Sequence, residues 1–267
     1  MSSKYALGYS EREIKRLHFQ SSIIEPITIR MLRSCGISRG QNVLDIGSGT
    51  GCVSRLASIM VGSTGSVTGI EQSCSAINIA NRDKKDNISY ICGKFEEVAF
   101  NKKFDVVVGR AVLLFQDKIH LFLEKAANLV KPGGYLAFHE IDDSRQFHSY
   151  PPVGLWDRTM AELLIRLKKV CPQYDISRRF VKVFDEVGIS IPNITYEIPV
   201  AGGRAEKLCF WAVETLCSLS ENPESILFSD GFKTNSKSLL YSLQNEIYKN
   251  KSQVEFLGQS CAWVKIK

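Results

Sequence analysis

Residues 43–51 of this chain read Val-Leu-Asp-Ile-Gly-Ser-Gly-Thr-Gly, and this stretch decides the fold. Its apolar beginning, Val43 to Ile46, suits a short strand buried in a parallel sheet. A stretch with helical character, Cys52 to Met60, follows the glycines. Glycine permits positive φ angles and lets the backbone approach a ligand closely. The stretch therefore predicts a strand, a tight glycine turn and a helix, with room for a ligand at the turn.

The spacing of the three glycines narrows the kind of turn. Gly47, Gly49 and Gly51 follow a G-x-G-x-G pattern, and Asp45 stands two residues ahead of the first. A dinucleotide-binding loop has the spacing G-x-G-x-x-G instead, which argues against an NAD-dependent dehydrogenase. A structural strand-to-helix turn would explain the glycines alone. The aspartate and its spacing favour a binding loop.

Strands and helices alternate along the first half of the chain. After the first strand, apolar runs predict buried strands over 67–70, 88–92, 104–108 and 135–139, and two later strands over 194–200 and 254–266. The alternation predicts an α/β fold with a doubly wound, mostly parallel sheet of seven strands and helices on both faces. Ligands of such sheets bind beyond the carboxyl ends of the strands.

The chain is predicted to form one domain over residues 1–267, because no internal repeat or low-complexity linker divides it. Apolar residues at helical spacing predict helix over 11–35, and Pro26 is expected to break this stretch in two. Helical insertions are expected over about 144–190 and 202–250, the second with a short helix at 225–228. These insertions are expected to cap the active site at the carboxyl end of the sheet.

The glycine stretch resembles motif I of the class I S-adenosylmethionine (SAM) methyltransferases. Residues 131–136, Lys-Pro-Gly-Gly-Tyr-Leu, resemble the turn before the fifth strand in many small-molecule members. Residues 7–17, with Gln20 in the next turn, are similar to a segment that folds over SAM as a lid in one group of them. The resemblance implies the class I fold with an antiparallel last strand, a helical lid over 1–36, SAM as cofactor and S-adenosylhomocysteine as product.

The resemblance also implies cofactor-binding roles. Asp45 and the glycine turn would hold the amino-acid half of SAM, and Glu71, at the end of the second strand, would accept hydrogen bonds from both ribose hydroxyls. Gln72 follows where the adenine ring would stack. The predicted cofactor-binding residues are Tyr9, Gln20, Asp45, Gly47, Ser48, Gly49, Gly51, Glu71, Gln72, Lys94, Phe95 and Arg110.

Two of these positions have more than one interpretation. Lys94 stands where the family often has an acid that binds the adenine amine, so adenine recognition is expected to rest on backbone groups and Phe95 stacking, or on Glu96 instead. Arg110, after the fourth strand, suits a carboxylate of SAM or of a substrate, although a surface ion pair explains it equally well. No Asn-Pro-Pro-Tyr follows that strand, which argues against DNA adenine and protein glutamine substrates.

Candidate catalytic residues follow the fifth strand. His139 could take a proton from the acceptor because its ordinary pKa lies near the working pH, and Glu140 stands beside it. The alternative is that His139 is a packed strand-end residue and Glu140 an ion-pair partner, with catalysis by alignment and desolvation alone. Asp142, Asp143 and His148 lie nearby, but no metal-ligand spacing accompanies them, so no metal is predicted.

Composition sets the broad class of protein. The 267 residues are 44% hydrophobic and 23% charged, which is ordinary for a globular protein, and the net charge of +6 comes from scattered basic residues rather than a nucleic-acid groove. Eight cysteines without a C-x-x-C pair indicate no disulfide framework and a reducing setting. We expect a cytoplasmic protein, monomeric or homodimeric, with no membrane span or membrane partner.

The sequence thus favours a SAM-dependent methyltransferase acting on a small molecule. A catalytically inactive SAM-fold binding protein is one alternative, motivated by Lys94 in place of the expected acid. A nucleic-acid methyltransferase is another, motivated by the positive charge. Neither the acceptor nor the methylated atom follows from the sequence.

Overall fold

The computed structural model describes residues 11–142, 149–220, 222 and 224–267. The chain divides into two compact units. The sheet unit consists of residues 25–142, 172–197 and 259–267, and the helical unit consists of residues 1–24, 143–171 and 198–258. The boundary between them runs through the first helix and again near the start of the last strand.

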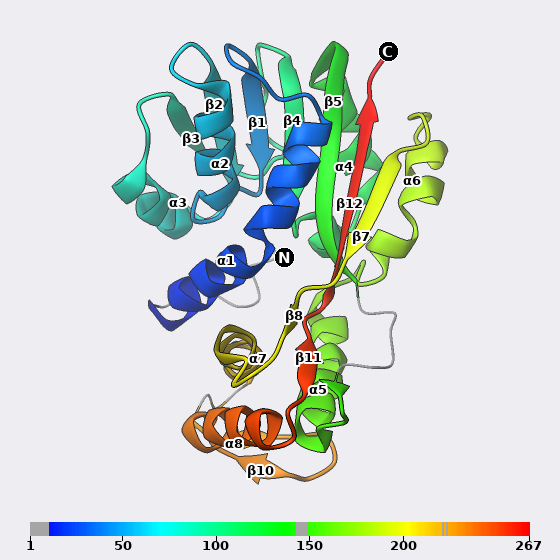
Figure 1. Ribbon diagram of the computed structural model, residues 1–267. Coiled ribbons are helices and arrows are strands. Elements are labelled where there is room, and N and C mark those ends of the chain that lie inside the picture. The colour runs from blue at the N-terminus through cyan, green and yellow to red at the C-terminus, as the bar shows by residue number, and fades with distance from the viewer. Residues whose placement is uncertain (1–10, 143–148, 221, 223) are drawn as a thin grey trace. The chain divides into compact units, whose positions relative to one another are not determined.

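The sheet unit is built on seven strands in the order β3-β2-β1-β4-β5-β12-β7 (Figure 1). Their bounds are β1 Asn42–Ile46, β2 Ser66–Glu71, β3 Ile88–Cys92, β4 Phe104–Arg110, β5 Val130–Asp142, β7 Asn193–Glu197 and β12 Gly258–Lys265. The first five strands pair in parallel, and β12 runs antiparallel to β7. The α/β sheet with an antiparallel late strand is confirmed.

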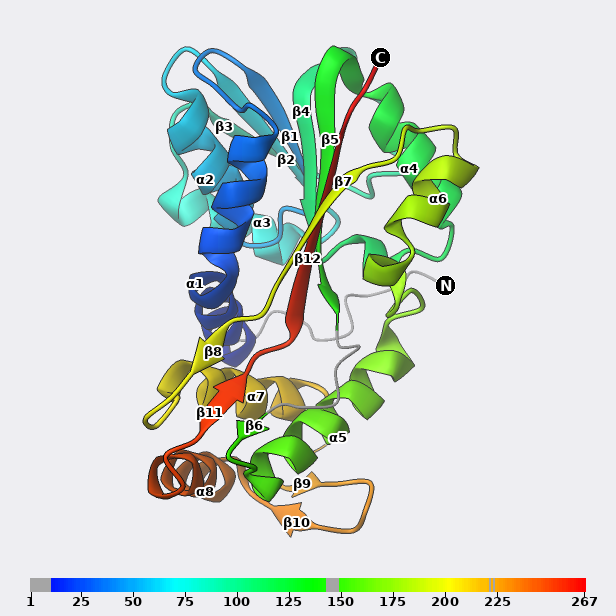
Figure 2. The same ribbon diagram turned by 45° about the vertical axis from the view of Figure 1, so that its right-hand side comes forward.

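Helices cover both faces of this sheet, as Figures 1 and 2 show. The helices and short 3-10 turns of the unit are the second half of α1 (Glu11–Ser34), α2 (Cys52–Val61), α3 (Cys74–Ala80), α4 (Ile119–Asn128), α6 (Phe180–Glu186), η1 (Asn81–Asp83), η2 (Leu113–Phe115) and η3 (Ile176–Arg178). Alternate strand residues face opposite ways. Ala137 joins the core under α1 and α2, whereas Phe138 packs against Phe122 of α4 and Phe184 of α6.

The helical unit consists of three main helices and short strands: α5 (Gly154–Val170), α7 (Glu206–Ser218), α8 (Ser236–Lys249), β6 (Ser149–Tyr150), β8 (Val200–Ala201), β9 (Ile226–Leu227), β10 (Lys233–Thr234) and β11 (Gln253–Glu255). Its core contains the buried rings of Trp156 and Trp211, the latter packed edge-on against Phe256. The prediction of a short helix at 225–228 is wrong, because this segment contains the strand β9, which pairs with β10. No helix in the described ranges is long and apolar enough to cross a membrane.

The first helix differs from its prediction. α1 runs unbroken from Glu11 to Ser34 with Pro26 inside it. Proline removes one backbone hydrogen bond, but Ile27, Met31 and Leu32 are buried in the core of the sheet unit and stabilise the helix beyond it. Packing therefore outweighs the local preference for a break.

The expected insertions coincide only partly with the helical unit. Residues 172–190 belong to the sheet unit, where η3 contacts β5 and α6 contacts α4. The second half of the expected lid, residues 25–36, belongs to the sheet unit as well. The single domain over 1–267 and the capping role of the insertions stay predictions.

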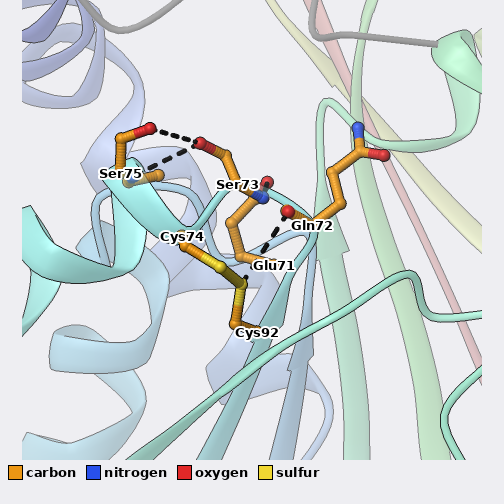
Figure 3. The surroundings of a disulfide bond; sticks show 7 residues. Glu71, Gln72, Ser73, Cys74, Ser75 and Cys92 are labelled. Carbon is orange, nitrogen blue, oxygen red and sulfur yellow. Dashed lines mark hydrogen bonds between the residues drawn. A yellow bond between two sulfur atoms is a disulfide. The ribbon is translucent and has the colours of Figure 1, made fainter. Parts of the chain in front are cut away.

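One expectation about the cysteines is wrong. Cys74, at the start of α3, and Cys92, at the end of β3, form a disulfide, and both residues are exposed (Figure 3). Cys92 pairs with Glu71 across the β2–β3 ladder. The turn after Glu71 brings Cys74 back to the end of β3, next to Cys92. The other six cysteines take no part in a disulfide, and five of them are buried.

The disulfide should stabilise the sheet unit mainly by restricting the unfolded chain. Its cysteines are 18 residues apart, so a loop of that size predicts a loss of about 3 kcal/mol for the double variant Cys74→Ser/Cys92→Ser, measured by urea unfolding without reductant. With reductant present, wild type and variant should unfold alike. Equal stabilities without reductant, or an intact mass with two extra hydrogens in the untreated protein, would contradict the bond.

Candidate active site

The site is built on the edge of the sheet where the parallel strands end. β1 leads into the glycine turn, β2 ends at Glu71 and β4 ends at Arg110. The β1–β4 register pairs Ile46 with Gly109, so the next residues along the two strands, Gly47 and Arg110, lie side by side. The β4–β5 register pairs Arg110 with His139. The residues that the sequence singled out on four strands therefore meet at one edge.

The three glycines of the turn have different surroundings, although all three have positive φ angles. A Cβ built at Gly51 would overlap the Tyr90 hydroxyl, and one at Gly47 would lie 3.0 Å from the Val112 side chain. Among the residues that the structure describes, the nearest atom to a Cβ at Gly49 would be a backbone oxygen at 4.0 Å. Gly47 and Gly51 therefore serve packing, whereas Gly49 borders open space in which a ligand can approach the backbone.

Asp45 holds the turn onto the helix that follows. Its carboxylate accepts a hydrogen bond of 2.6 Å from the Ser54 hydroxyl on α2, and both residues are buried. Burial raises the pKa of Asp45 to about 6, although the Ser54 hydrogen bond and the positive charge of Arg110 oppose the rise. Asp45 thus fixes the loop to α2, in a position where the charge of Arg110 affects its pKa.

Glu71 joins the glycine turn to the end of β2. Its Oε2 accepts a hydrogen bond from the Gly49 amide at 3.1 Å, and its Oε1 accepts one from the Ser73 amide at 2.9 Å. Burial raises the pKa of the carboxyl, and these amides oppose the rise. Ser48 is buried with its hydroxyl over Gly69, and Gln72 is exposed. The carboxylate is therefore anchored beside Gly49, the glycine of this turn that borders open space.

The two residues after β3 are less suited to their predicted role. Lys94 lies 3.2 Å from Glu97 in an exposed ion pair. The Phe95 ring is 6% exposed, packs against Phe122 of α4, and has the Lys125 ammonium 5.1 Å from its centre. Both side chains are thus engaged within the protein, and their cofactor contacts stay predictions.

A hydrogen-bonded chain runs inward from Arg110. Its Nη1 donates to the Thr28 hydroxyl at 3.2 Å, that hydroxyl lies 3.0 Å from His139 Nδ1, and His139 Nε2 lies 3.1 Å from Gln259 Oε1. Burial, reinforced by the charge of Arg110, lowers the pKa of His139 to about 3. A neutral imidazole with both nitrogens occupied is a positioning group, and the general-base role of His139 stays an untested prediction.

Glu140 differs from its neighbour. Its Oε1 accepts hydrogen bonds from the Val112 and Leu113 amides at 3.0 and 2.9 Å, which holds the turn after β4. Its Oε2 has no hydrogen-bond partner among the residues that the structure describes. Burial raises the pKa of Glu140 to about 7, against the pull of these amides. A group that exchanges a proton near neutrality suits acid–base chemistry.

The remaining predicted residues lie elsewhere. Gln20 belongs to the helical unit, where its Oε1 accepts hydrogen bonds from Arg16 Nη1 at 2.7 Å and Trp211 Nε1 at 2.9 Å. Arg16 in turn is held by the buried carboxylate of Glu13. Tyr9, Asp143 and His148 lie outside the described residues, as do residues 7–10 of segment 7–17. Within the described ranges no cluster of three or more His, Cys, Asp or Glu side chains could hold a metal ion.

Sequence reasoning missed Thr28, Ser54 and Gln259. The sequence does give a signal for Thr28, which is a polar residue on the apolar stripe of α1. The structure shows that it is completely buried. A single sequence gives no signal for Gln259, because its partner His139 is distant along the chain. It gives none for Ser54 either, because only the geometry of the turn identifies Asp45 as its partner. These residues support the charged groups of the site rather than replace them.

A family model described as a methyltransferase domain matches residues 37–199, more than half of the chain. The chain belongs to this family. Its sheet order and the glycine turn after β1 are those of the class I SAM-dependent branch, as the sequence predicted. The matched range contains every site residue of the sheet unit except Thr28 and Gln259.

Two curated methyltransferases are similar to parts of the chain. The ubiquinone biosynthesis O-methyltransferase of Coxiella burnetii is 27% identical over 146 residues, covering 53% of this chain and 59% of that protein. The malonyl-[acyl-carrier protein] O-methyltransferase of Priestia megaterium is 28% identical over 97 residues, covering 36% of this chain and 35% of that one. The chain thus spans 59% of the length of the first relative and 35% of the length of the second.

Solved structures support the fold. The MccD protein has a TM-score of 0.55 at 16% identity, covering 90% of this chain and 96% of its own. A SAM-dependent methyltransferase from Aquifex aeolicus has a TM-score of 0.51 at 19% identity, covering 72% of this chain and 92% of its own. At such identities the likeness concerns the arrangement of strands and helices alone.

The glycines give a prediction that separates binding from folding. Gly49→Ala should cost only about 1 kcal/mol of stability, from its positive φ, yet weaken S-adenosylhomocysteine binding because the methyl group enters the open space. Gly51→Ala should cost about 3 kcal/mol or more, because its methyl group overlaps Tyr90. Urea unfolding and calorimetric titration measure the two effects. Unchanged binding by Gly49→Ala would contradict the assignment of the open face.

Glu140 gives a prediction about pH. The pKa of its carboxyl is higher in the folded protein than in the unfolded chain, so its contribution to stability is full below about pH 4.5 and is lost as the pH rises through about 7. Glu140→Gln mimics the protonated form. The variant should therefore gain stability over wild type, by up to about 3 kcal/mol, between about pH 5 and pH 8.

The control for this experiment is Glu97→Gln, which removes the same charge at an exposed position. Its stability difference from wild type should change little across the same pH range. Parallel stability curves for wild type and Glu140→Gln would show that Glu140 is ionised throughout and would contradict the raised pKa.

Proposed function

We propose that this protein transfers the methyl group of SAM to a small-molecule acceptor. The observation that carries the proposal is the open face of Gly49, bordered by the carboxylate of Glu71 on one side and the end of β4 on the other. A glycine backbone and an acid at this spacing suit the amino-acid and ribose ends of one elongated ligand. Bound SAM would supply an electrophilic methyl group on a sulfonium.

The residues of the glycine turn would hold the amino-acid half of SAM. Gly47, Ser48 and Gly51 keep the turn in shape through packing, and Asp45 ties it to α2. We assign Arg110 to the carboxylate of SAM, since it ends the neighbouring strand β4 and its charge reaches Asp45. We favour this pairing over a surface ion pair because a guanidinium fork matches a carboxylate.

Glu71 would hold the ribose, and Gln72 would lie along the adenine. Glu71 already accepts two amide hydrogen bonds, which fix its carboxylate and oppose the rise of its pKa that burial causes. A carboxylate has lone pairs for further donors, so ribose hydroxyls can add to these bonds. Because Lys94 and Phe95 are engaged elsewhere, adenine recognition would rest on backbone groups near β3.

For proton removal we propose Glu140 in preference to His139. The pKa of Glu140 lies at about 7, so the group can both accept and release a proton under working conditions. The low pKa of His139 makes it a weak base. Where the acceptor ionises without help, alignment and exclusion of water would carry the reaction instead.

The acceptor class follows from the relatives only as a proposal. Both curated relatives are named O-methyltransferases, which makes oxygen acceptors with phenol or carboxyl groups the first class to test. We retain the proposals of a cytoplasmic protein, monomeric or homodimeric, without nucleic-acid or membrane partners. The exposed Cys74–Cys92 bond is within reach of cellular dithiols in that setting.

Thermal-shift assays with SAM and S-adenosylhomocysteine, followed by product detection over a panel of oxygen acceptors, test the proposal directly. Stabilisation by both ligands with a methylated product supports an enzyme. Stabilisation without product from any acceptor favours the inactive binding protein, and no stabilisation by either ligand would overturn the proposal. A product only with nucleic acid, with salt-sensitive binding, would favour the second alternative.

The ribose role of Glu71 gives a quantitative prediction. Glu71→Ala should weaken S-adenosylhomocysteine binding about tenfold to a hundredfold, because charge-assisted hydrogen bonds contribute about 1.5–3 kcal/mol. The matched control is Glu97→Ala, whose exposed carboxylate pairs with Lys94 and should leave affinity unchanged. Equal affinities of Glu71→Ala and wild type in calorimetric titration would remove Glu71 from the site.

A further inference from the structure

We propose that Thr28, His139 and Gln259 are positioning residues that hold the Arg110 guanidinium in place for the carboxylate of SAM. The inference rests on the proposed function and adds a set of residues to it. Three of the elements involved are far apart in the chain: Thr28 comes from α1, His139 from β5 and Gln259 from β12. All belong to the sheet unit.

The hydrogen bonds of this set run in one direction. Gln259 Oε1 can only accept, so His139 Nε2, 3.1 Å away, carries the ring hydrogen and donates to it. Nδ1 of the neutral ring then accepts from the Thr28 hydroxyl at 3.0 Å, and the Thr28 oxygen accepts from Arg110 Nη1 at 3.2 Å. Each member therefore fixes the donor or acceptor state of the next.

Burial makes this arrangement stiff. Thr28 is 0% exposed, and His139 and Gln259 are each 1% exposed, whereas Arg110 is only partly buried. Buried polar groups that lose a partner carry a large desolvation cost, so each link resists opening. The chain of bonds is thus a fixed interior support for one charged group at the surface of the sheet edge.

The place of Arg110 explains what such support would achieve. Arg110 ends β4 beside Gly47, and its positive charge acts on the carboxyl of Asp45 and on the imidazole of His139. A long arginine side chain loses rotamer freedom when it binds a ligand. An arginine already fixed by Thr28 loses less, so it binds a carboxylate more tightly.

The support should act on one end of the ligand only. Glu71 is held by a different set of hydrogen bonds, from the Gly49 and Ser73 amides. Loss of the Thr28 hydroxyl should therefore weaken ligands that carry the amino-acid carboxylate and spare ligands that lack it. 5′-Methylthioadenosine keeps the nucleoside and the sulfur of S-adenosylhomocysteine without the amino-acid carboxylate, so the two form a matched pair.

The experiment compares Thr28→Val with Thr28→Ser by calorimetric titration of both ligands. Thr28→Val, which keeps the shape without the hydroxyl, should bind S-adenosylhomocysteine about tenfold more weakly and 5′-methylthioadenosine as wild type does. Thr28→Ser restores the hydroxyl and should bind both ligands as wild type does. Thr159→Val, at a buried threonine of the helical unit, controls for the substitution itself.

A double-mutant cycle with Arg110→Ala separates positioning from general structure. In the Arg110→Ala background, Thr28→Val should cause no further loss of S-adenosylhomocysteine affinity. Additive losses, equal weakening of both ligands, or no effect of Thr28→Val would each overturn the inference. If the wild-type protein binds neither ligand, the proposed function fails first, and the two failures are thereby distinguished.

Gln259→Met provides a second test at the far end of the chain of bonds, should Thr28→Val not fold. It keeps the length of the side chain and removes the acceptor for His139 Nε2. The same selective loss of about tenfold or less for S-adenosylhomocysteine is expected, again absent in the Arg110→Ala background. A loss that affects both ligands alike would assign Gln259 a structural role and overturn its part in the inference.

Discussion

The hydrogen bond from the Gly49 amide to the Glu71 carboxylate is the constraint on which the rest of the site depends. It joins the turn after β1 to the end of β2, so two strand ends act as one surface. The turn can take this path only because Gly47, Gly49 and Gly51 all adopt positive φ angles. The Ser73 amide completes the anchor, and the Cys74–Cys92 bond closes the same turn on its outer side.

Desolvation gives the sheet edge its electrostatic character. Burial raises the pKa of Asp45 to about 6 and that of Glu140 to about 7, and lowers the pKa of His139 to about 3. Such shifts are typical of functional sites, although structural networks also produce them, and the charge of Arg110 acts on two of the three groups, Asp45 and His139. Each of these buried groups takes part in hydrogen bonds with nearby amides or hydroxyls, which offset part of the free-energy cost of its burial.

The helical unit contains its own buried polar network. Glu13 and Arg16 form a fully buried ion pair, and Arg16 and Trp211 together fix the carbonyl oxygen of Gln20. A buried ion pair adds little net stability against an apolar core, so its value lies in fixing side-chain positions. The amide nitrogen of Gln20 is thereby held in one orientation, which keeps the proposed cofactor role of Gln20 open to test by substitution.

The sequence by itself determined the class of the fold and the main loop of the site. The strand before Gly47, the glycine spacing and Glu71 are local signals, because strands and tight turns depend on neighbouring residues. The tertiary structure alone decided that α1 continues through Pro26, that Cys74 meets Cys92, and that Thr28 and Gln259 support His139. These outcomes depend on contacts between residues far apart in the chain, where packing and desolvation outweigh local preference and leave no periodic trace in one sequence.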